Sequence, residues 1–191
     1  IGTSSRLLPQ SLGGYTIGIL VQTNFGGILT MNSAPVGREL RQYSYKDNLI
    51  DTANEDKIDG SIMIVVATDA PLNAKNLERL AMRAIMGLAR TGSHASNGSG
   101  DYVVAFSTHP SVRRPRLSEK PVASLSLVNA SMSPLFAATA EATEEAIYNA
   151  IFKATTVESD RGIRKAVPIK DLMRILEKYN ALHWDKNISK N

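Results

Sequence analysis

The segment KIDGSIMIVVATDAP, residues 57–71, changes from charged to apolar within a few positions. Gly60 ends the polar part and Ser61 opens an apolar run that is rich in β-branched residues. A near-continuous run of this kind predicts a strand over Ile62–Thr68 that is buried on both faces. The Gly60-Ser61 junction has two interpretations. It is either a turn that enters the strand, or a bond that the protein cuts so that Ser61 becomes a new chain start.

Helix and strand signals continue on both sides of this segment. Asn73 occupies a helix N-cap position, and apolar residues then recur at helical spacing to Leu88, which predicts a helix over about 74–90. The polar stretch at about 41–60 predicts a flexible linker. The alternation of strands and helices predicts layered α and β elements around one core. Further expected elements are strands at Tyr15–Gln22 and Ile28–Met31, a buried strand at Tyr102–Ser107, a helix at about 133–154, and a helix from Pro168 to about 182.

Composition limits the classes of function. The 191 residues suit a single domain, 1–191, and the chain has no cysteine, which excludes disulfides and cysteine catalysis. The net charge of +4 and the short basic cluster at 113–116 do not indicate a nucleic-acid partner. The three histidines lack metal-ligand spacing, so no metal or cofactor is expected. No apolar run reaches the roughly 18 residues of a membrane span, so no membrane partner is expected. No signal-peptide pattern opens the chain, and the cytoplasm is the favoured location.

The dipeptide Gly-Ser carries little information alone, because it also occurs at 92–93 and 98–99. The context of Gly60 is more telling. Without a Cβ, its carbonyl is open to attack and its backbone tolerates strain. A cut before Ser61 would supply a hydroxyl nucleophile and, on the same residue, an α-amine with an ordinary pKa of about 7.7–8.0. One cleavage would therefore provide nucleophile and base without histidine.

Several motifs, in order, resemble the DmpA-type aminopeptidases, the group of L-aminopeptidase/D-esterases and β-aminopeptidases. The resemblance covers essentially the whole chain. The motifs are GTSSRLLPQSLGGYTIGILVQTNFG (2–26), APVGREL (34–40), DGSIMIVVATDAPL (59–72), MGLARTG (86–92), NGSGDYVVAFST (97–108) and TEEAIYNAIFKAT (143–155).

This resemblance implies a self-cleaving precursor with an N-terminal serine nucleophile. Carried over by motif, cleavage falls between Gly60 and Ser61, so that 1–60 is the C-terminal part of an α chain and 61–191 a β chain. Ser99 corresponds to a serine that hydrogen-bonds the region of the nucleophile's amine. Asp101 stands where members often carry glutamate. Asn24 corresponds to an asparagine whose side-chain amide helps to form the oxyanion hole.

The resemblance also implies an α/β fold, a four-layer α/β/β/α sandwich of the DmpA and ornithine acetyltransferase type. The N-terminal part of that fold is not in this chain, so we expect exposed sheet edges and an incomplete active site. The implied substrates are peptides, amides or esters with a free N-terminal amine, and the implied assembly is a homotetramer of αβ units. Two alternatives stay open: an acyltransferase like the ornithine acetyltransferases, which use a threonine nucleophile, and a non-catalytic module that stays uncut.

Overall fold

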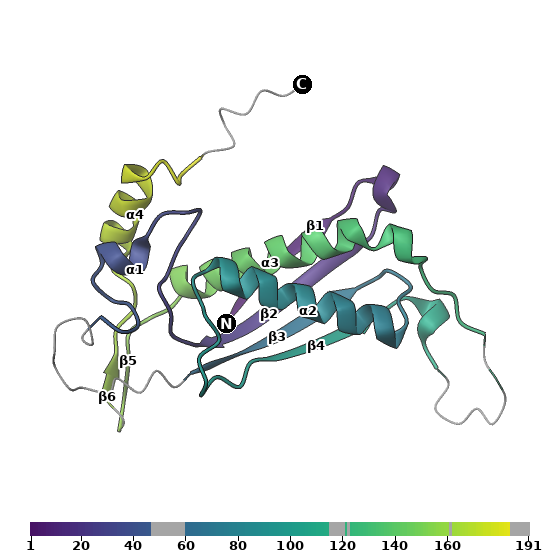
Figure 1. Ribbon diagram of the computed structural model, residues 1–191, viewed down its shortest axis with the longest axis horizontal. Coiled ribbons are helices and arrows are strands. Elements are labelled where there is room, and N and C mark those ends of the chain that lie inside the picture. Colours follow the sequence, from purple (N-terminus) through teal and green to yellow (C-terminus); the bar gives the residue numbers. More distant parts are fainter. Residues whose placement is uncertain (47–59, 115–120, 122, 161, 184–191) are drawn as a thin grey trace.

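The computed structural model describes residues 1–46, 60–114, 121, 123–160 and 162–183 (Figure 1). Most of the linker predicted at 41–60 lies outside these residues. In chain order the elements are β1 (Gly2–Leu7), η1 (Gln10–Leu12), β2 (Thr16–Asn24), α1 (Val36–Glu39), β3 (Ser61–Thr68), α2 (Ala74–Arg90), β4 (Tyr102–Ser107), η3 (Pro110–Val112), η4 (Asn129–Ser131), α3 (Ser133–Phe152), β5 (Val157–Ser159), β6 (Gly162–Arg164) and α4 (Ile169–Lys178).

One four-stranded sheet, in the order β1-β2-β3-β4, forms the centre of the chain. The first two pairings are antiparallel, whereas β3 and β4 run parallel and are connected through α2. A parallel pair needs such a crossover, and the helix then lies on one face of the sheet. Helices α2 and α3 pack against each other and cover the same face (Figure 1). β1 and β4 are the edge strands of the described sheet.

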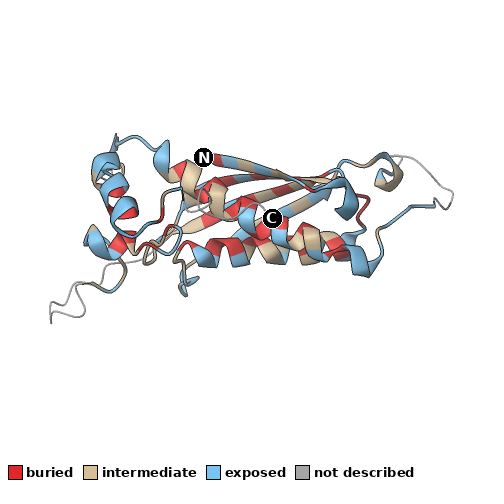
Figure 2. Cartoon of the chain, turned by 90° about the horizontal axis from the view of Figure 1, so that it is seen from above, coloured by how far each residue is buried: buried red, intermediate tan, exposed pale blue. Residues whose placement is uncertain are grey.

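Burial alternates along β3, so the prediction of a strand buried on both faces is wrong for this chain. Ile62, Ile64 and Val66 are buried beneath the helices, whereas Met63 on the other face is 43% exposed. The reason is that the described helices cover only one face of the sheet, as the alternating colours of the strands show (Figure 2). The strand predicted at Tyr102–Ser107 forms as β4, but it is not buried. We call the uncovered side the open face, formed by the exposed side chains of Leu20, Met63, Tyr102, Val104 and Phe106.

The main core lies between the sheet and the helices. Helices α2 and α3 approach closely at Gly87, where an added Cβ would overlap the backbone carbonyl of Ala140. Buried threonines on α3 satisfy their hydroxyls within the helix, since Thr139 Oγ1 donates to the Leu135 carbonyl at 2.7 Å. Small residues therefore pack where the two helices meet, and larger aliphatic residues fill the space between the helices and the sheet. Its largest buried members include Ile17, Val21, Ile62, Ile64, Leu72, Leu80, Leu88, Leu135 and Ile147.

One buried and one exposed side chain on α2 test this packing. Leu80 is fully buried, whereas Met82 is 59% exposed. We expect Leu80→Ala to lower the free energy of unfolding by about 2–5 kcal/mol, because it leaves a cavity in the core. Met82→Ala on the same helix should change it by no more than about 0.5 kcal/mol. Urea denaturation of both variants measures the difference, and equal midpoints would contradict this description of the core.

The prediction of α2 is confirmed, with Ala74–Arg90 as the helix and Asn73 as its N-cap. The Asn73 side chain accepts a hydrogen bond from the Asn76 N–H at 2.9 Å. The strand predicted at Ile28–Met31 does not form. Its N–H groups at Ile28 and Thr30 donate instead to carbonyls of the turn that follows α2. The strands β1, β5 and β6 were not expected.

A smaller cluster of buried residues lies at one end of the molecule, where α1 and α4 are side by side (Figure 1). Helix α4 begins after Pro168, as predicted, but ends at Lys178 rather than near 182. Asn180 takes a left-handed conformation there, and the Ala181 N–H turns back to the Leu176 carbonyl at 2.8 Å. We call this cluster the second core, formed by Met31, Ala34, Val36, Leu172, Ile175, Leu176 and Ala181.

Candidate active site

Ser61 is the first residue of β3, and its partner across the antiparallel pair with β2 is Asn24. Residues that lie directly opposite in such a pair project their side chains to the same face. Because side chains alternate along a strand, Ser61 shares its face with Met63 and not with the buried Ile62. The structure therefore brings Ser61 and Asn24 together at one end of the open face.

The parallel pairing of β3 with β4 brings the NGSGD motif to the same place. The Gly100 N–H donates to Ser61 Oγ at 2.9 Å. Asp101 Oδ1 accepts the N–H of Ile62, the residue after the nucleophile candidate, at 3.0 Å. A turn upstream, closed by the Ser99 N–H on the Ser96 carbonyl at 2.8 Å, directs these groups toward β3. The start of β3 is thus surrounded by donors and acceptors from the loop before β4.

The hydroxyl of Ser99 has two acceptors within reach. Its Oγ lies 3.0 Å from the carbonyl oxygen of Gly60 and 2.8 Å from Asp101 Oδ1. A serine hydroxyl carries a single proton, so it donates to one of the two oxygens at a time. Ser99 consequently connects the carbonyl of the candidate cleavage bond to the carboxylate of Asp101.

Gly60 fits this position because it has no side chain. A Cβ at residue 60 would overlap the backbone carbonyl oxygen of Asn24 and crowd the Cα of Phe25. Any larger residue would push the peptide bond away from the end of β2. The absence of a Cβ at Gly60 therefore lets the candidate bond lie against the strand that carries Asn24.

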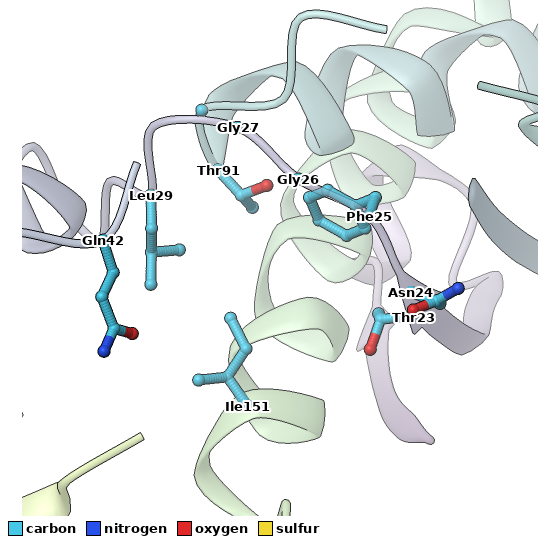
Figure 3. A pocket seen from close by; sticks show the side chains of 10 residues that line it. Thr23, Asn24, Phe25, Gly26, Gly27, Leu29, Gln42, Thr91 and Ile151 are labelled. Carbon is cyan, nitrogen blue, oxygen red and sulfur yellow. The ribbon is translucent and has the colours of Figure 1, made fainter. Parts of the chain in front are cut away.

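A pocket of about 300 Å³ adjoins Asn24 at the end of β2 (Figure 3). Apolar side chains of Phe25, Leu29 and Ile151 line it, together with the polar side chains of Thr23 and Gln42. These residues come from the end of β2, from the loop beyond it and from the C-terminal turn of α3. The pocket is a mainly apolar hollow beside the site, and its wall was not anticipated from the sequence.

All five residues predicted for the site lie together: Asn24, Gly60, Ser61, Ser99 and Asp101. Sequence reasoning missed the N–H of Gly100, although the NGSGD motif contains it. Outside this group, His94 Nε2 lies 3.3 Å from the hydroxyl oxygen of Tyr45. Within the described residues, no cluster of three or more His, Asp and Glu side chains has the arrangement of a metal site. Among those residues, too, no helix is long and apolar enough to cross a membrane.

Comparison with known proteins identifies the class. The profile of peptidase family S58 matches residues 1–165, and the chain belongs to this family. A curated relative, the beta-peptidyl aminopeptidase BapA of Sphingosinicella microcystinivorans, is 38% identical over 190 residues, which are 95% of this chain and 48% of the relative. The chain thus spans about half the length of the curated relatives it matches.

Solved structures agree with this class. The L-aminopeptidase D-Ala-esterase/amidase from Ochrobactrum anthropi, described as a variant of the Ntn hydrolase fold, matches with a TM-score of 0.78 and 33% identity, over 95% of this chain and 48% of that one. The PH0078 protein from Pyrococcus horikoshii matches with a TM-score of 0.78 and 42% identity, over 93% and 47%. The predicted fold class is therefore confirmed, and the four-stranded sheet with α2 and α3 forms one sheet layer and one helical layer of it.

Proposed function

We propose that this chain is the catalytic half of a self-processing serine aminopeptidase, which removes N-terminal residues from short peptides, amides or esters. One observation carries the proposal: the hydroxyl of Ser61 follows directly after the carbonyl of Gly60, and both are held by groups of the NGSGD loop. The Gly100 N–H contacts the hydroxyl oxygen and Ser99 contacts the carbonyl oxygen. Membership of family S58 supports the same reading.

Self-cleavage would begin with attack of Ser61 Oγ on the carbonyl carbon of Gly60. The Gly60–Ser61 C–N bond breaks, an ester forms on Oγ, and the hydroxyl proton passes to the departing amine. Water then hydrolyses the ester, which restores the Ser61 hydroxyl and leaves a carboxylate on Gly60. Ser99 would donate to the Gly60 oxygen as negative charge develops there, and such donors are among the largest contributions to catalysis.

Turnover would use the same groups in new roles. The freed α-amine of Ser61 accepts the proton from its own hydroxyl as Oγ attacks the substrate carbonyl. Asp101 and Ser99 hold the resulting ammonium, and the side-chain amide of Asn24 donates to the substrate oxyanion. The ammonium then protonates the leaving amine, and water hydrolyses the acyl-Ser61 ester. Each proton is thereby returned within the site.

The open face supports the proposal that a further layer of protein packs against this chain. A contiguous apolar patch on a protein surface commonly marks a site where another element packs. The matched relatives are about twice as long as this chain. We propose that a second sheet layer of the complete protein covers the open face and closes the site between the two sheets. A homotetramer of αβ units in the cytoplasm remains our prediction for the assembly, and size-exclusion chromatography with light scattering tests it.

Intact mass spectrometry of the denatured protein tests the cleavage itself. For the 191-residue chain we expect two pieces, residues 1–60 and 61–191. The fragment masses place the cut to the residue, because neighbouring bonds would give different values. A single uncut mass from a protein that hydrolyses peptides would contradict the mechanism, and an uncut, inactive protein would favour the non-catalytic module.

A further inference from the structure

The chain folds back on itself in the segment that follows β2. We call residues 27–44 the wall segment, because Leu29 and Gln42 within it line the pocket beside Asn24. The Gly37 N–H donates to the Leu29 carbonyl at 2.8 Å, and the Ser44 N–H donates to the Gly27 carbonyl at 3.0 Å. These bonds fix the shape of the segment, while its outer side is covered by another part of the chain.

Helix α4 provides that cover through the second core. Leu172, Ile175 and Leu176 lie at helical spacing and are at most 8% exposed. They pack with apolar residues of the wall segment in the second core, and Leu29 and Ile151 pack against this cluster. Both of these residues also line the pocket. The apolar side of α4 therefore supports two walls of a hollow that it does not itself line.

Polar contacts strengthen the same junction. Lys178 Nζ lies 2.9 Å and 3.1 Å from the two carboxylate oxygens of Glu39, and the Tyr179 hydroxyl donates to Glu39 Oε1 at 2.6 Å. The hydrogen bond from Tyr179, followed by that from Lys178, holds the pKa of Glu39 below its ordinary value. The carboxylate thus stays charged and paired at neutral pH. Asn32 adds a bond from its side-chain amide to the Ala181 carbonyl at 3.2 Å.

We propose that the pocket beside Asn24 receives an apolar side chain of the substrate and that α4 is the positioning element that holds its outer wall. The lining of Phe25, Leu29 and Ile151 suits an aliphatic group. Asn24 borders the pocket and is also the strand partner of Ser61, so it connects the pocket to the candidate site. This inference rests on the proposed function for its substrate. In a protein cut after Gly60, α4 would belong to one chain and the wall segment to the other.

Amide hydrogen exchange tests the support by α4 independently of catalysis. We expect Leu176→Ala to speed exchange of the protected amides in residues 29–42 at least about tenfold, since it removes a fully packed side chain from the second core. Glu39→Gln should speed it by about two- to fivefold. Glu177→Gln on the same helix is the matched control and should leave exchange unchanged. Unchanged exchange in both test variants overturns the inference, and if Leu176→Ala does not fold, unchanged exchange in Glu39→Gln alone does so.

Steady-state kinetics with two amides tests the substrate class. In Glu39→Gln we expect KM for leucinamide to rise by about threefold, with kcat within about twofold of the parent value, because only uniform binding is affected. KM for glycinamide, which has no side chain to place, should not change. Equal effects on the two amides, or none, overturn the apolar pocket. A parent protein with no amidase activity refutes the proposed function instead, and the exchange data then decide the role of α4.

Discussion

Replacement of Ser61 by alanine is expected to leave the Gly60–Ser61 bond intact and to lower turnover by roughly 10⁴–10⁶-fold, the range seen when a serine nucleophile is deleted. The variant loses the hydroxyl that would attack the carbonyl carbon of Gly60. Without cleavage, the nitrogen of residue 61 also stays in a peptide bond and cannot act as the base. The variant therefore lacks both the nucleophile and the base. Mass spectrometry measures the cleavage, and kcat/KM for a short peptide measures the turnover.

Ser93→Ala is the matched control, because Ser93 follows Gly92 in another of the Gly-Ser dipeptides. Its hydroxyl oxygen accepts the N–H of Ala95 in the loop and makes no described contact with Ser61. This variant should be cut and active like the parent protein. Two fragments from Ser61→Ala, split after Gly60, would refute the role of Ser61 in its own release.

Replacement of Asp101 by asparagine should lower kcat/KM by roughly 10²–10³-fold, the range seen when one group that stabilises charge in the transition state is removed. The amide keeps the size of the side chain and an oxygen that can accept the Ile62 N–H. It has no charge, however, and cannot stabilise an ammonium on Ser61 during the reaction. The loss should therefore appear mainly in kcat, with the folded structure retained.

Asp69→Asn is the matched control for this change. Asp69 lies just beyond the other end of β3, where its Oδ1 accepts the Thr16 N–H at 2.7 Å. Both carboxylates thus bind a backbone N–H near an end of the same strand, but only Asp101 lies near Ser61. Equal losses from the two variants would mean that Asp101 acts through the sheet and not on the reacting groups.

Local signals in the sequence were sufficient to predict the elements that have their own capping residue and apolar periodicity. The N-cap Asn73 and the apolar stripe that follows it define α2 without help from the rest of the chain. Ile28–Met31 has strand-like residues, but its N–H groups bond to the turn after α2, a contact between distant parts of the chain. β1 was missed for a related reason: as a polar edge strand, Gly2–Leu7 owes its conformation to β2 and not to its own composition.

The site was predictable only in part, because its residues meet through contacts between distant parts of the chain. The residue types at Gly60 and Ser61 suggested the chemistry, and the family resemblance supplied Asn24, Ser99 and Asp101. Their meeting depends on the register of β3 with β2 and β4, which no local pattern specifies. The predictions that β3 is buried on both faces and that β4 is buried were wrong. An apolar run in the sequence does not show whether the same chain covers both faces of the strand.

The shared proton of Ser99 has a consequence for the fate of the α-chain end. Before any cut, a neutral carbonyl oxygen of Gly60 and the carboxylate of Asp101 compete for that proton, 3.0 Å and 2.8 Å from the same Oγ. Hydrolysis at Gly60 would turn the neutral competitor into a second anion. Two negative charges at one hydroxyl repel each other, so the new terminus would be expelled from the place that an incoming substrate needs. In this arrangement the act of processing would also clear the site.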